Sequence, residues 1–257
     1  MITIKKTKLG KIPKIAVAVT DKGDSKLIKS LYVDILEIRV DQFKKLDSNY
    51  VRGVIASKKK IGVPLILTVR SKEEGGQKGI ADEVKLNIFK ENISSVDAVD
   101  IELNSPILTD IVKLAKKHKK VIIISWHNFR STPNEKFLKG VLAKAKKIGA
   151  HIVKIAAKAN KIDDVIKLAE FTRENKAKNL IVISLGGIGS ISRLLFPMFG
   201  SLITYAYIKK PSGLGQVPLE DLRDHLRLYY PQYNQYYVSK SGMPDSKSVF
   251  SAPLKIA

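Results

Sequence analysis

The chain has 257 residues, of which 44% are hydrophobic and 27% charged, and its 46 Lys and Arg against 24 Asp and Glu give a formal net charge of +22. That length is enough for one large domain with a substantial core. The absence of cysteine excludes disulfides, thiolate metal sites and a thiol nucleophile, and no apolar run approaches the roughly 18–20 residues that a membrane helix needs.

Residues 1–14 contain lysines but no apolar segment followed by a small-residue cleavage site, so we predict no signal peptide and expect a cytoplasmic protein. The large positive charge favours anionic partners in general. The lysines are spread along the predicted helices, however, and we interpret them as a solvated basic surface. Long-range steering of an anionic substrate is the functional alternative.

Short runs rich in Ile and Val alternate with longer amphipathic segments along the whole chain. The predicted strands are Ile15–Val19, Asp34–Val40, Leu65–Val69, Ala98–Leu103, Val121–Ser125, Ile152–Ala156, Leu180–Ser184 and Leu202–Tyr207. The predicted helices between them include Asp82–Asn92, Pro106–Lys117, Asn134–Ile148, Asp163–Glu174 and Ser190–Met198.

Eight strand–helix units in roughly 230 residues are typical of an α/β fold of the (β/α)₈ TIM-barrel type. We therefore predict a single barrel domain over residues 1–228, followed by a C-terminal tail over residues 229–257. An open doubly wound sheet is the alternative architecture.

Charged side chains recur toward the carboxyl ends of these strands, although parallel strands buried on both faces should be apolar throughout. The residues concerned are Glu37, Arg39, Arg70, Glu102, His127 and Lys154. Alternate strand residues share a face, and barrel active sites lie at the carboxyl ends of the strands. The pattern predicts a titratable pocket at that end.

Lys154 lies in the apolar strand Ile152–Ala156, where burying a charged amine is costly. Burial lowers the pKa of a lysine, and a neutral lysine can attack a ketone to form an imine. The structural alternative is a lysine paired with Glu37 or Glu102. His127, at the end of the preceding strand, suits proton transfer near neutral pH, and its alternative is a hydrogen-bonded structural histidine.

Three further segments contain candidates for binding. Glu74 follows Arg70 in a glycine-containing loop and could orient a histidine, or it could be a solvated loop carboxylate. Arg193 lies about one turn into the helix that follows a glycine-rich turn and could clamp a carboxylate, or it could lie on the helix surface. The loop Lys210–Gln216 follows the eighth strand and is typical of a lid.

Taken together, six segments resemble the type I 3-dehydroquinate dehydratases. They are Glu37–Asp41, Thr68–Gly76, Ser125–Pro133, Lys154–Ala156, Ser184–Arg193 with Phe199–Ser201, and Ser212–Gln216. They follow the family's order and spacing from about Ile15 to Arg223. The resemblance implies a TIM-barrel lyase of the shikimate pathway, which leads to chorismate and the aromatic amino acids. Its substrate would be the small anion 3-dehydroquinate and its product 3-dehydroshikimate.

The resemblance also implies roles for single residues. Lys154 would form an imine with the substrate ketone, and His127, held by Glu74, would move the proton of the adjacent carbon to the departing hydroxyl. Arg193 would bind the substrate carboxylate. Those expected to bind hydroxyls or close over the substrate are Glu37, Arg39, Arg70, Ser212 and Gln216. It implies no metal or cofactor, a homodimer, and no nucleic-acid or membrane partner.

Some positions depart from the family's usual pattern without removing a catalytic group. The most consequential is the pair Gly213-Leu214, which stands where Ala-Pro is usual in the lid and makes the lid softer.

Two other functions fit parts of the sequence. A class I aldolase also uses a barrel lysine, and Gly186–Ser190 would then hold a phosphate, but Arg193 and the Ser125–His127 segment argue against it. A nucleic-acid-binding barrel rests on charge alone, since the sequence contains no recognition motif and no interleaving of aromatic and basic residues within the barrel.

Overall fold

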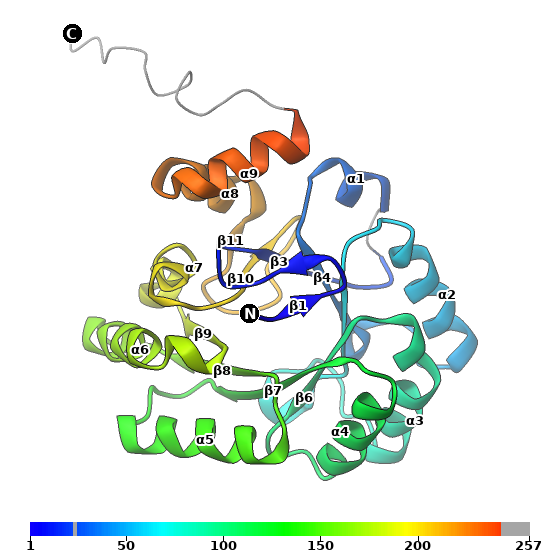
Figure 1. Cartoon of the computed structure of the whole chain (residues 1–257). Helices are drawn as coiled ribbons and strands as arrows, with labels where there is room; N and C mark the ends of the chain where they lie inside the picture. The colour runs from blue at the N-terminus through cyan, green and yellow to red at the C-terminus, as the bar shows by residue number, and fades with distance from the viewer. Residues whose placement is uncertain (23–24, 243–257) are drawn as a thin grey trace, which may run out of the picture.

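The computed structural model describes residues 1–22 and 25–242, which form eight strand–helix units around a curled parallel sheet (Figure 1). The strands are β3 (Ile15–Val19), β4 (Ile35–Arg39), β5 (Leu65–Thr68), β6 (Ala98–Glu102), β7 (Val121–Asn128), β8 (Ile152–Lys158), β9 (Leu180–Leu185) and β10 (Thr204–Tyr207). Each strand from β3 to β8 pairs in parallel with the next in the sequence, and β10 pairs with β3. The segment just before β10 meets the start of β9, where Leu180 bridges Ser201 and its carbonyl accepts from the Leu202 N–H at 2.8 Å. The predicted TIM-barrel fold is confirmed.

The helices lie outside this ring of strands (Figure 1). They are α1 (Ser25–Ser30), α2 (Ser48–Lys59), α3 (Asp82–Asn92), α4 (Leu108–Lys117), α5 (Glu135–Ile148), α6 (Ile162–Glu174), α7 (Ser192–Leu195) and α8 (Leu219–Tyr229). In α5 the Asn134 side chain accepts from the Phe137 N–H at 2.9 Å, and Gly149 ends the helix at φ +114°. Within residues 1–22 and 25–242, no helix combines the length and the apolar character needed to cross a bilayer.

The segment predicted as one helix over Ser190–Met198 is instead three short turns. Single 3₁₀ turns, Ile188–Ile191 and Phe196–Phe199, flank the four residues of α7. Pro197 lacks the N–H that would continue the α-helical ladder, and Gly200 ends the segment with φ +108°. The prediction of a regular helix was therefore wrong here.

Apolar side chains fill the barrel interior at the amino ends of the strands. An N-terminal hairpin of β1 (Thr3–Ile4) and β2 (Thr7–Lys8) contributes Ile4 and Leu9 to this inner core. The strand residues of the inner core include Ala16, Ile35, Ile66, Ala98, Ile123, Ile152 and Ile181. Because this end is plugged, the space left for polar side chains is at the carboxyl ends, where β11 (Val217–Pro218) also pairs with β10.

The start of the predicted tail forms a further helix, α9 (Pro231–Ser241), which packs on α8 and returns to the start of the barrel. The Asp34 carboxylate joins the two ends of the fold. It accepts from the Ile15 N–H at 2.9 Å, from the Tyr236 hydroxyl at 2.6 Å and from Lys240 Nζ at 3.3 Å. Lys14 Nζ lies 3.2 Å from the centre of the Tyr236 ring. Residues 243–257 of the tail lie outside the described residues.

We expect Tyr236→Phe to lower the free energy of unfolding by about 1–2 kcal/mol, because it removes a hydrogen bond to a buried carboxylate. Urea unfolding followed by circular dichroism measures this change. Tyr229→Phe is the matched control, since Tyr229 is 56% exposed, and it should change stability by less than about 0.5 kcal/mol. Equal stability of the two variants would show that α9 is not held through Asp34.

Candidate active site

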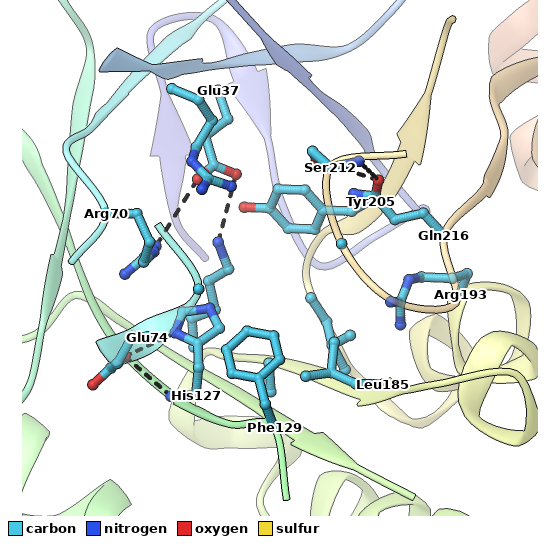
Figure 2. Close-up of a pocket in the computed structure, with 16 residues that line it drawn as sticks. Glu37, Arg70, Glu74, His127, Phe129, Leu185, Arg193, Tyr205, Ser212 and Gln216 are labelled. Carbon is cyan, nitrogen blue, oxygen red and sulfur yellow. Dashed lines mark hydrogen bonds and ion pairs between the residues drawn. The ribbon is translucent and has the colours of Figure 1, made fainter. Parts of the chain in front are cut away.

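The carboxyl ends of the barrel strands surround a cavity of about 80 Å³ (Figure 2). All nine residues that the sequence analysis assigned to the site line it: Glu37, Arg39, Arg70, Glu74, His127, Lys154, Arg193, Ser212 and Gln216. Strands β4, β7 and β8 carry Glu37, His127 and Lys154, while the loops after the strands supply others. A closed parallel sheet brings these distant segments to a single rim.

Lys154 is 4% exposed, and its amine is paired inside the barrel. Its Nζ lies 3.0 Å from Asp100 Oδ2 and 3.5 Å from Glu37 Oε2. The pairing with Glu37 matches part of the structural alternative considered from the sequence, whereas Glu102 is not a partner. Asp100 takes that place, and the sequence analysis missed it.

Arg70, 2% exposed, holds the carboxylates of this cluster in position. Its guanidinium lies 2.8 Å from Asp100 and 3.1 Å from Glu102, and it donates to Ser125 Oγ at 2.7 Å. Burial disfavours the charged forms of both Arg70 and Asp100, but the attraction between these opposite charges is stronger. The carboxylates raise the pKa of Arg70, while Arg70 and then Lys154 lower the pKa of Asp100. Most of the guanidinium therefore takes part in contacts that hold the other polar side chains of the site in place.

His127 and Glu74 form the second interacting pair. Glu74 Oε2 lies 2.8 Å from His127 Nδ1 and accepts from the His127 backbone N–H at 3.1 Å. Burial, followed by the charges of Arg70 and Lys154, holds the pKa of His127 well below its usual range. Burial also raises the pKa of Glu74 to about 8, against the opposing effect of Arg70. The contact fixes the imidazole so that Nε2 is left for chemistry.

A glycine allows the ring of Phe129 to pack beside this pair. The Phe129 ring is stacked on His127, with ring centres 6.3 Å apart and an interplanar angle of 10°. Gly75 has φ +86°, and a Cβ there would lie 2.5 Å from the Phe129 ring. The glycine after Glu74 is therefore needed both for the turn and for the aromatic wall.

Arg193 lies on the opposite side of the cavity, beside the predicted lid (Figure 2). It donates to the Ser184 carbonyl at 3.0 Å and to the Leu214 carbonyl at 3.2 Å, while its buried Nε has no partner in the described chain. Burial lowers the pKa of Arg193 to about 10. No carboxylate among the described residues contributes to this shift, and a buried cation without such a partner favours binding of an anion. The glycine turn 186–190 does not line the cavity.

The lid is folded over the cavity and held by its own side chains. The Ser212 N–H donates to Gln216 Oε1 at 2.7 Å. Gly215 has φ +71°, and a Cβ there would lie 2.2 Å from the Gly186 carbonyl oxygen. Small-molecule sites usually enclose about 300 Å³ or more, so with the loop in this position the cavity, at about 80 Å³, is smaller than most such sites.

Two residues of the site were missed from the sequence. Asp100 lies on β6 two residues before Glu102, and this spacing of two in a strand was a usable signal, because it places both carboxylates on one face. Tyr205 on β10 also lines the cavity. An aromatic residue in a buried strand is normally interpreted as part of the hydrophobic core, so nothing in the sequence indicated that the Tyr205 hydroxyl faces the site.

Comparisons with known proteins agree with this geometry. The family model described as "Type I 3-dehydroquinase" matches residues 15–232. A 3-dehydroquinate dehydratase from Hydrogenobaculum is 39% identical over 219 residues, which cover 84% of this chain and 99% of that protein. One from Aquifex aeolicus is 38% identical over 222 residues, covering 84% and 98%.

Solved structures give the same result. The 3-dehydroquinate dehydratase from Clostridium difficile, determined with covalently modified comenic acid, superposes with a TM-score of 0.81 at 30% identity and covers 90% of this chain and 98% of that one. The Aquifex aeolicus enzyme has a TM-score of 0.77 at 37% identity, with 84% and 99% covered.

We expect Gly215→Ala to unseat the lid, because the added methyl group would collide with the Gly186 carbonyl and break the Arg193–Leu214 contact. Trypsin cleavage after the exposed Lys209 should then be several-fold faster than in the unaltered chain. Gly213→Ala is the matched control, since a Cβ at that position meets nothing within 4 Å. Equal cleavage rates in the two variants would contradict the assigned lid packing.

Proposed function

Because the chain belongs to the type I 3-dehydroquinase family, we propose that it dehydrates 3-dehydroquinate to 3-dehydroshikimate through an imine on Lys154. This is the reaction of the shikimate pathway that its relatives' names indicate. The observation that carries the proposal is that a buried lysine amine and a largely buried imidazole, 10% exposed, line the same cavity.

Imine formation begins with attack of Lys154 Nζ on the substrate ketone carbon. The amine must give up a proton to attack, and the carboxylates of Asp100 and Glu37, at 3.0 and 3.5 Å, are close enough to receive it. Loss of the ketone oxygen as water completes the C=N bond. The imine then draws electrons from the neighbouring carbon, which makes its proton more acidic.

Elimination is assigned to His127. Its Nε2 takes the proton from the carbon next to the imine, and the protonated imidazole then gives that proton to the departing hydroxyl, which leaves as water. Glu74 stabilises the imidazolium through the 2.8 Å contact at Nδ1. Hydrolysis of the imine releases the enone product and restores Lys154.

Arg193 is assigned to the substrate carboxylate. Two observations within residues 1–22 and 25–242 support this role: the buried Nε has no partner, and burial alone, with no carboxylate, accounts for the lowered pKa. Binding of an anion there would also place it under the lid, through the contact of Arg193 with Leu214. Glu37, Arg39, Arg70, Ser212 and Gln216 remain the proposed contacts for the substrate hydroxyls and for closure.

Two further expectations stay predictions from the sequence: a cytoplasmic location and a homodimer. The net charge of +22 is consistent with electrostatic steering of the anionic substrate, which would make association slower at high salt.

We expect Lys154→Ala to abolish measurable formation of the enone from 3-dehydroquinate, followed by its ultraviolet absorbance. Borohydride added during turnover should leave a stable adduct on Lys154 of the unaltered enzyme, identified by peptide mass. The matched control is Lys158→Ala, which removes a half-buried lysine at the end of the same strand and should keep near-normal turnover. Turnover in Lys154→Ala, or an adduct elsewhere, would exclude the imine mechanism.

We also expect the pair His127–Glu74 to govern the acid limb of kcat/KM. With the pKa of Glu74 at about 8, an extra proton occupies the pair below that pH, and Nε2 is then not free to accept another. Activity should therefore rise as pH increases through about 8.

In Glu74→Gln only His127 can bind that proton, and its pKa lies well below the usual range. The acid limb should therefore move to lower pH by about one unit or more. The plateau value of kcat should fall by about 10²-fold or more, because an amide stabilises the imidazolium poorly. Glu73→Gln, at the exposed neighbouring position, is the control. An unchanged acid limb in Glu74→Gln would assign the ionisation to another group.

A further inference from the structure

The side chain of Tyr205 lines the cavity beside the lysine, and no step described so far uses it. It lies on β10, is 3% exposed, and its ring centre is 4.5 Å from Lys154 Nζ. Figure 2 shows its hydroxyl pointing across the cavity toward Glu37 rather than into the surrounding core. The phenol therefore lies next to the two groups that begin imine formation.

The Tyr205 hydroxyl is buried without a hydrogen-bond partner in the described part of the chain. Buried hydroxyls are nearly always paired, and an unpaired one costs stability. Other buried or half-buried tyrosines follow that rule: the hydroxyl of Tyr236 donates to Asp34 at 2.6 Å and that of Tyr230 to the Leu194 carbonyl at 2.7 Å. A hydroxyl that points into the cavity and has no such bond within the described residues is a donor available to a bound molecule.

The phenol is suited to donate rather than to act as a base. Burial, with further effects from Glu37 and Asp100, raises the pKa of Tyr205 well above its usual range, so the hydroxyl keeps its proton. Glu37 is near enough to influence the phenol and also lies 3.5 Å from Lys154 Nζ. Glu37 is thus close both to Lys154, which releases a proton, and to Tyr205, which can donate one.

The oxygen on the ketone carbon is the substrate atom that still lacks a donor. The proposed function already assigns His127 to the adjacent carbon and Arg193 to the carboxylate. A carbon bonded to Nζ lies about 1.5 Å from it, so its oxygen stays within the space bounded by Lys154, Glu37 and Tyr205. This oxygen must gain protons before it can leave as water.

We propose that Tyr205 donates its hydroxyl proton to the oxygen of the ketone carbon while the imine forms, with Glu37 supplying the replacement proton. The proposal rests on the imine mechanism described above. Lys154 loses one proton to Glu37 as the C–N bond forms. The oxygen takes the phenol proton and becomes a hydroxyl, and the phenol takes the proton held by Glu37. The adduct nitrogen then loses a second proton to Glu37, which reaches the hydroxyl through Tyr205 in the same way. The nitrogen lone pair makes the C=N bond as the C–O bond breaks and water leaves. Ketone and ammonium become a protonated imine and water, with no net change in protons or electrons.

The test compares Tyr205→Phe with the unaltered enzyme by rapid mixing with 3-dehydroquinate and quenching with borohydride at successive times. We expect the rate of adduct formation on Lys154 to fall by about 10²-fold, the low end of the usual range for a lost general acid. The deuterium isotope effect on kcat, measured with substrate labelled at the carbon that loses its proton, should fall toward one, because imine formation becomes rate-limiting.

Phenylalanine keeps the ring and its packing, so a purely structural tyrosine would leave the rate of adduct formation unchanged. Tyr207→Phe is the matched control on the same strand, as Tyr207 does not line the cavity, and it should behave like the unaltered enzyme. An unchanged rate of adduct formation in Tyr205→Phe would overturn the assignment of Tyr205. No adduct in the unaltered enzyme would overturn the imine mechanism itself, and the inference with it.

Discussion

The contact between Arg70 and the carboxylates around Lys154 is the constraint on which the rest of the site depends. Asp100 is shared by Arg70, at 2.8 Å, and by Lys154, at 3.0 Å. Burying any one of these charges alone would be strongly unfavourable, and each is tolerated because it is paired. Burial lowers the pKa of His127 most, and the same cations lower it further, so the cluster around the proposed nucleophile also influences the protonation of the proposed base. The position of Lys154 and the protonation of His127 thus both depend on the same arrangement of charges.

The barrel makes this arrangement possible by dividing its interior into two ends. Ile, Ala and Leu side chains fill the amino end, which the N-terminal hairpin closes. Charged side chains collect at the carboxyl end, where neighbouring strands present residues side by side: Ser125 is in register with Lys154, and Glu102 with Ser125. Apolar packing at the amino ends of the strands therefore stabilises the fold, while the charged side chains at the carboxyl ends remain available for chemistry.

Much of this was predictable because it depends on local patterns. The strand Ile15–Val19 and the helix Asp82–Asn92 were predicted with the bounds that the structure has, and the carboxyl-end charges located the cavity. What failed depended on contacts between segments. Asp100 was missed because its importance comes from Arg70 and Lys154, which lie 30 and 54 residues away. The regular helix over Ser190–Met198 failed because Pro197 interrupts its ladder.

The two sides of the cavity differ in how firmly they are held, and this difference suits the reaction. On the side of Lys154 the side chains are bound to one another by several charged contacts, so the nucleophile and its proton acceptors stay in place. On the other side Arg193 meets the lid through one backbone carbonyl, at 3.2 Å. A substrate carboxylate bound by Arg193 would therefore lie on the side with fewer contacts, while its ketone would meet the side with more. Tyr205 comes from β10, the strand that leads into the lid, and its ring lies 4.5 Å from the Lys154 amine. It thus connects the strand before the lid to the proposed site of imine formation.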